Sequence, residues 1–167
     1  MFKKLLPFTL LLAVAVMLSA CNSTANELVD YYNNETKEIA KIDEEFVLLQ
    51  EEYILLTSEE NEIELYEELL SKRLLPKSQE IVDYAKGVEL KEDEIQELHE
   101  LLIASVEHRH QAFESELEAV KEYFETGSEE KFDESAQSLE NYIEKQQAFD
   151  NRLEELIEEY EIEITEK

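Results

Sequence analysis

The sequence predicts an all-α fold: an elongated antiparallel helical bundle with coiled-coil-like packing. The chain has 167 residues but only two glycines and two prolines, whereas a β-rich fold would need many more turn residues. Apolar side chains recur at steps of three and four, the spacing that places them along one face of a helix. Short polar breaks separate these stripes, so we expect four helices joined by short turns.

The first helix follows a short polar segment and ends where residues 57–61 interrupt its apolar stripe. Thr57 and Glu60 fit a capping box, which favours a turn there. The alternative is one helix that continues through Leu74, and it would give three helices instead of four. The stripe consists of Leu28, Tyr32, Ile39, Ile42, Phe46, Leu49, Tyr53 and Leu56.

The second helix carries a stripe from Ile63 to Ala85 and is predicted to end at Gly87, as the left-handed residue after a helix. Pro76 lies inside this segment. Because proline lacks an amide hydrogen and clashes with the preceding turn, we expect it to kink the helix or to open a new one at its first turn.

The third helix is predicted to start near Lys91 and to stop at Gly127, and Ser128 is predicted to cap the fourth. We place the bundle domain at residues 27–161 and a frayed tail at residues 162–167. The third stripe is Ile95, Leu98, Leu102, Val106, His110, Phe113, Leu117, Val120 and Phe124, and the fourth is Phe132, Ala136, Leu139, Ile143, Gln146, Phe149, Leu153, Leu156 and Tyr160.

Residues 1–20 have the layout of a signal peptide. Lys3 and Lys4 precede an apolar run over residues 5–18. This run would be roughly 21 Å long as a helix, which is too short to cross a hydrocarbon layer of about 30 Å. A short basic start followed by such a run is typical of an export signal.

The end of this run, Leu18-Ser19-Ala20-Cys21, resembles the lipobox of bacterial lipoproteins. The resemblance implies that a peptidase cuts between Ala20 and Cys21 and that the Cys21 thiol carries a lipid. Cys21 is the only cysteine, so it has no internal disulfide partner in an oxidising compartment. We therefore expect a lipidated tether at residues 21–26 and an anchor on the extracytoplasmic face of the cell membrane.

The expected mature chain is strongly acidic. Removal of Lys3 and Lys4 with the signal peptide takes the formal net charge from −28 to −30. Such a surface repels nucleic acid. We therefore do not expect nucleic acid to bind through general electrostatic attraction.

The histidines and carboxylates do not predict a metal or catalytic site. No two of His99, His108 and His110 have the i, i+4 spacing of helical chelation, and His110 with Glu114 supplies only two ligands. The glutamate clusters lack a calcium-binding loop and fit solvated helix faces. We predict no catalytic residue, no metal and no cofactor.

The preferred interpretation of His110, together with Arg109, is a place in the helix seam opposite a polar residue such as Gln146.

Two pairs of adjacent rings suggest a contact surface. Two adjacent rings on a helix cannot both face the core, and this applies to Tyr31 with Tyr32 and to Tyr123 with Phe124. Tyr31 and Tyr123 are the candidate contact patch.

The lipobox at residues 18–21 followed by a helical, acidic, glycine-poor domain resembles the small extracytoplasmic lipoproteins of Gram-positive bacteria that are described as cell-wall-binding lipoproteins. We expect a non-catalytic module, anchored in the bilayer through Cys21, that binds an envelope protein or peptidoglycan. The alternative is a small metal-binding or enzymatic surface lipoprotein. An enzyme would need a concave site with converging polar groups, for which narrow stripes leave little room.

Overall fold

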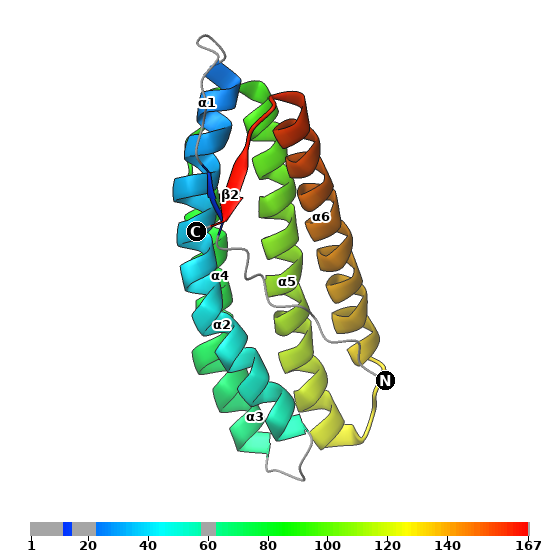
Figure 1. The fold of residues 1–167 in the computed structure, drawn as a ribbon. Helices are drawn as coiled ribbons and strands as arrows, with labels where there is room; N and C mark the ends of the chain where they lie inside the picture. Colours follow the sequence, from blue (N-terminus) through cyan, green and yellow to red (C-terminus); the bar gives the residue numbers. More distant parts are fainter. Residues whose placement is uncertain (1–11, 15–22, 58–62, 167) are drawn as a thin grey trace.

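The computed structural model describes residues 12–14, 23–57 and 63–166, and its architecture is an all-α bundle of four helical segments (Figure 1). The predicted fold class and the four-helix alternative are confirmed. The predicted turn residues 58–61 lie outside the described residues. The segments are α1 (Ser23–Asp30), η1 (Tyr31–Glu35) and α2 (Thr36–Thr57); α3 (Ile63–Leu69), η2 (Leu70–Leu74) and α4 (Leu75–Gly87); α5 (Asp93–Thr126); and α6 (Phe132–Glu159).

Two strands of three residues each accompany the helices. β1 (Leu12–Val14) and β2 (Ile164–Glu166) pair antiparallel, with Ala13 opposite Thr165. β1 belongs to the predicted signal peptide and β2 to the predicted tail. Residues 15–22, which include the lipobox, lie outside the described residues. Cleavage before Cys21 would therefore remove the partner of β2.

The π-helical turn η1 corrects the prediction for Tyr31. In this wide turn the amide of Thr36 bonds to the carbonyl of Tyr31, and both residues are buried. A π-turn holds about one residue more than an α-turn, so it shifts the buried stripe by one position. Tyr31 is only 1% exposed, while Tyr32 is half-buried. The predicted exposure of Tyr31 is therefore wrong.

The second π-turn, η2, ends two residues before Pro76. The amide of Leu75 bonds to the carbonyl of Leu70, and Pro76 lies in the first turn of α4. This confirms that the proline lies in the first turn of an α-helix, α4, which η2 joins to α3 within one helical segment. A π-turn before a proline is physically reasonable because the missing amide interrupts the α-helical bonding pattern at this place in any case.

Of the two glycines predicted to end helices in the left-handed conformation, only Gly127 does so. Gly127 ends α5 with a φ of 75°, and its amide bonds to the carbonyl of Tyr123. Gly87 is instead the last helical residue of α4, followed by an extended Val88, so its predicted left-handed conformation is wrong. Ser128 accepts a hydrogen bond from the amide of Glu130. It caps the turn before α6 rather than the helix, which begins at Phe132.

The core lies between α2, α4 and α5, and α6 packs mainly along α5. Phe46 of α2 meets Phe113 of α5 edge to face, with ring centroids 5.4 Å apart. On α6 only Phe149 and Leu156 of the predicted stripe are buried, and Ile143 is 37% exposed. The fourth helix therefore covers the core less completely than its stripe predicted. Within the described ranges, every helix is too short or too polar to cross a membrane.

Candidate contact surface

The end of the bundle nearest the predicted lipidation residue is fixed by side-chain bonds to the start of α5. α1 begins two residues after Cys21. The Glu27 carboxylate accepts hydrogen bonds from the amides of Lys91, at 2.9 Å, and Glu92, at 2.6 Å. Thr24 donates to the Glu92 carboxylate at 3.1 Å. A negative charge at a helix start satisfies free amides and suits the helix dipole.

The end of α6 joins the same region. The Tyr160 hydroxyl donates a hydrogen bond to the Glu94 carboxylate in the first turn of α5. Figure 1 shows α1, the start of α5 and the end of α6 gathered at one end of the bundle. We call this region, residues 23–30, 88–94 and 156–160, the anchor end. Polar bonds hold its three segments together.

The opposite end exposes aromatic rings. Tyr123 and Phe124, in the last turns of α5, are 43% and 44% exposed. The Tyr123 ring lies 6.2 Å from that of Phe132, the first residue of α6, and 5.8 Å from that of Phe124, measured between centroids. The predicted exposure of Tyr123 is confirmed. Phe124, predicted for the buried stripe, is exposed as well, although its ring lies 5.7 Å from that of the buried Tyr66.

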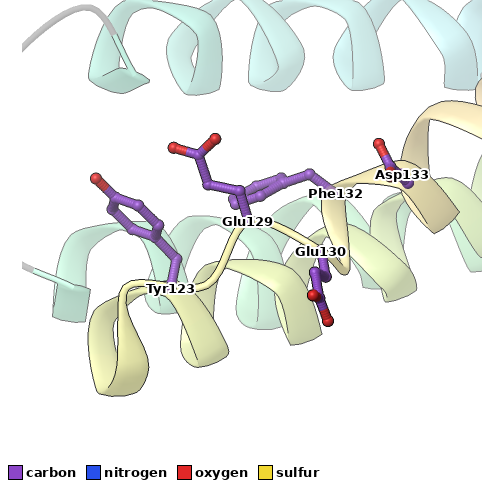
Figure 2. Close-up of a pocket in the computed structure, with 5 residues that line it drawn as sticks. All are labelled: Tyr123, Glu129, Glu130, Phe132 and Asp133. Atoms are coloured by element: carbon purple, nitrogen blue, oxygen red, sulfur yellow. The ribbon is translucent and has the colours of Figure 1, made fainter.

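Beside these rings lies an open hollow of about 660 Å³, which we call the distal hollow. Tyr123 and Phe132 line it together with three acidic residues, Glu129, Glu130 and Asp133. Figure 2 shows Tyr123, Glu129 and Phe132 projecting to the same side of the loop, whereas the Glu130 carboxylate points to the other side. The sequence indicated Tyr123 but not this surrounding set, because the path of the 127–131 loop decides which side chains meet.

The distal hollow receives no cation from the described part of the chain. Glu129, Glu130 and Asp133 form no ion pair there. The neighbouring Lys131 instead directs its Nζ toward Glu122, at 3.3 Å, and Glu118, at 3.7 Å. The hollow is therefore both aromatic and negatively charged.

Tyr31 belongs to a buried hydrogen-bond chain. Its hydroxyl lies 3.0 Å from Nδ1 of His99, whose Nε2 lies 2.7 Å from the carbonyl of Ala85. A carbonyl only accepts, so Nε2 carries the proton and Tyr31 donates to Nδ1. Burial lowers the pKa of His99, partly opposed by the Ala85 bond and by Glu35. A neutral histidine thus links η1, α4 and α5.

His110 makes a different contact from the one predicted. Its Nδ1 lies 2.6 Å from Ser78 Oγ, and its Nε2 lies 3.6 Å from the Glu114 carboxylate. These are the residue types of a nucleophile, a base and an orienting acid. Ser78, however, is 1% exposed and also donates to the carbonyl of Leu75. Its hydroxyl is out of reach of a substrate, so the contact holds α4 against α5.

Gln146, predicted to face His110, and Arg109, predicted to share its seam, each contact other residues. Gln146 of α6 accepts a hydrogen bond from Ser105 at 3.0 Å, so its predicted place opposite His110 is wrong. The buried guanidinium of Arg109 lies 2.6 Å from the Asp43 carboxylate and 4.4 Å from the Phe46 ring centroid. Arg109 therefore does occupy the seam, where it joins α5 to α2 by charge and by cation–π contact.

Among the residues that the structure describes, no group of three or more His, Cys, Asp or Glu side chains is arranged to hold a metal ion. No family model, curated protein or solved structure matches the chain. Its function is therefore inferred from the geometry of its own residues.

Proposed function

We propose that this protein is a membrane-anchored, non-catalytic cell-envelope lipoprotein that acts as a binding module for a protein partner or the cell wall. The observation that carries the proposal is the placement of the predicted tether and of the exposed rings at opposite ends of the bundle. α5 connects these ends over 34 residues, which correspond to about 51 Å of helix.

The short tether supports a defined position relative to a membrane. α1 begins at Ser23, inside the tether predicted at residues 21–26, so a lipid on Cys21 would lie two residues from the helix. Two extended residues span roughly 7 Å. Glu27 then fixes α1 to the amides of Lys91 and Glu92. In a lipidated protein the anchor end would therefore lie close to the bilayer, and the distal hollow would face away from it.

The polar side chains support binding rather than catalysis. His99 and His110 are engaged in internal hydrogen bonds. The distal hollow is open to solvent and is lined by two aromatic and three acidic residues, with no histidine, serine or cysteine among these lining residues. Catalytic groups work best in enclosed sites that exclude water, whereas exposed rings are common in interaction surfaces.

Lipid labelling tests the proposal. Cells expressing the full chain are grown with a labelled fatty acid and then fractionated. The wild-type protein should carry the label and sediment with the membranes, and Cys21→Ser should lose both properties. Ser23→Ala, which leaves the lipobox intact, serves as the control. A wild-type protein without label, or a Cys21→Ser variant that stays membrane-bound, would contradict the anchor.

Between the two kinds of partner, charge favours a protein over an anionic wall. A chain with a net charge of −28 is repelled by anionic polymers unless specific contacts outweigh the repulsion. The purified protein should therefore bind polymer-stripped peptidoglycan weakly and intact anionic wall still less. Strong co-sedimentation that is insensitive to salt would instead favour direct recognition of glycan.

A further inference from the structure

We infer, on the basis of the proposed binding function, that the distal hollow receives a lysine or arginine side chain from a basic segment of a partner protein. The inference rests on two features that recognise a cation and that meet at one place. One is a pair of rings, the exposed Tyr123 and the half-buried Phe132, and the other is a set of carboxylates that form no ion pair with a cation of the described chain.

The rings are arranged to contact a cationic side chain from two directions. Tyr123 and Phe132 stand at 67° to each other with centroids 6.2 Å apart, and Figure 2 shows both rings on the same side of the loop. The face of an aromatic ring attracts an ammonium or guanidinium group. Two inclined rings therefore offer a cation one ring face and one ring edge, and they pack against its aliphatic stem.

The carboxylates complete the recognition. Glu129 projects beside the two rings, and Asp133 follows Phe132 at the start of α6 (Figure 2). Both side chains are exposed, and neither forms an ion pair in the described part of the chain. A charge-assisted hydrogen bond from lysine or arginine would satisfy them. Lys131 does not compete, because it is directed toward Glu118 and Glu122.

Charge selects this occupant over the other candidates. A second copy of the chain would bring another net charge of −28, and an anionic glycan or polymer would bring the same sign of charge. The hollow measures about 660 Å³, more than a single side chain fills. A peptide segment can therefore insert its cation and cover the neighbouring ring of Phe124 with apolar residues.

Peptide binding to the full-length protein in nonionic detergent tests the inference. The probe is a fluorescein-labelled octapeptide with two arginines among leucine and serine, followed by anisotropy at physiological salt. The matched peptide carries citrulline, which has nearly the shape of arginine without its charge. We expect the arginine peptide to bind at least about tenfold more tightly than the citrulline peptide. Equal affinity, or no binding of the arginine peptide, would overturn the inference.

Charge variants distinguish peptide binding at the distal hollow from general electrostatic attraction to an acidic protein. Glu129→Gln with Asp133→Asn should weaken arginine-peptide binding about tenfold. Glu97→Gln with Glu100→Gln makes the same change of charge on exposed residues near the anchor end, and it should change the affinity less than about twofold. An equal loss in the two double variants would overturn the inference by showing non-specific attraction.

A ring variant provides the second, independent readout. Tyr123→Leu keeps an apolar side chain but removes the aromatic face, and it should weaken binding about three- to tenfold. Unchanged affinity would contradict the ring contact. Since Tyr123 is exposed, the variant should keep its helical circular dichroism. If the peptide does not bind but the protein still carries the lipid label, only the inference about the distal hollow fails. If the peptide binds tightly to a protein that carries no label, only the membrane anchor is contradicted.

Discussion

The two ends of the bundle use similar residues in opposite ways. At the anchor end, Glu27 and Glu94 are bonded to neighbouring segments, as is the ring hydroxyl of Tyr160. At the distal end, Glu129 forms no ion pair within the described chain, and Tyr123 is largely exposed. Acidic and aromatic residues in this bundle therefore either join segments or stay available to a partner, depending on the end at which they lie.

The same contrast explains why the distal end is the better candidate for function. Side chains with few internal contacts contribute little to folding, so the chain can use them for binding at small cost in stability.

The largest difference should appear between the packed half of α5 and its exposed end. Leu98 is fully buried, so Leu98→Ala should lower the free energy of unfolding by about 2–5 kcal/mol. Tyr123→Ala should cost less than about 1 kcal/mol because its ring is already exposed. Urea unfolding followed by circular dichroism measures both values. Similar costs at the two positions would contradict the assigned packing.

The next effect concerns the buried hydrogen-bond chain of Tyr31 and His99. Tyr31→Phe keeps the ring but leaves Nδ1 of His99 buried without a donor, and it should cost about 1–3 kcal/mol. Tyr32→Phe, at the half-buried neighbour, should stay within about 0.5 kcal/mol. A larger cost at Tyr32 would mean that the π-turn is not formed in solution.

A smaller effect should distinguish the two helix starts. Glu27→Ala removes the acceptor of two amides and the negative charge at the start of α5, and it should cost about 0.5–2 kcal/mol. Ser128→Ala, near the start of α6, should cost only a few tenths of a kcal/mol because its one bond, at 3.4 Å, is long. Thermal unfolding of the two variants provides the comparison, and a reversed order would contradict it.

The smallest effect is a pH dependence from His99. Its pKa is lowered in the folded protein by burial, so the unfolded chain takes up a proton first as the pH falls below about 6.5. The stability that neutral His99 contributes is therefore present above this pH and is lost on acidification. His99→Gln keeps a donor for the Ala85 carbonyl but does not titrate.

Melting temperatures at pH 7.5 and 5.5 measure this contribution as the difference between wild type and His99→Gln. The comparison cancels the contributions of the carboxylates, including Asp150, whose pKa is raised mainly by burial. The wild type should lose more stability than the variant over this interval. A smaller loss in the wild type would show that His99 is not buried in its neutral form.

The sequence predicted the four helices because stripes of apolar residues and the near absence of glycine and proline are local signals. It did not predict η1, since no residue type marks a π-turn, and a shift of one position moved Tyr31 from the expected surface into the core. The partners of His110 and Gln146 were also missed. Such pairs depend on how each helix is rotated against its neighbour.

The candidate site was predictable only in part for the same reason. Adjacent rings at Tyr123 and Phe124 signalled an exposed side chain, and the structure confirms this exposure. The meeting of Tyr123 with Phe132 and Glu129 depends on the loop between α5 and α6. Periodicity within a helix carries no information about the path of that loop.

Photocrosslinking on cells that express the full chain tests whether the distal hollow is the surface that binds a partner. A photoreactive benzoyl-phenylalanine is placed either at Tyr123, in the distal hollow, or at Glu97, an exposed residue near the anchor end. We expect a discrete protein adduct from position 123 that the arginine peptide suppresses by competition, and little protein adduct from position 97. Equal or stronger protein adducts from position 97 would contradict this expectation.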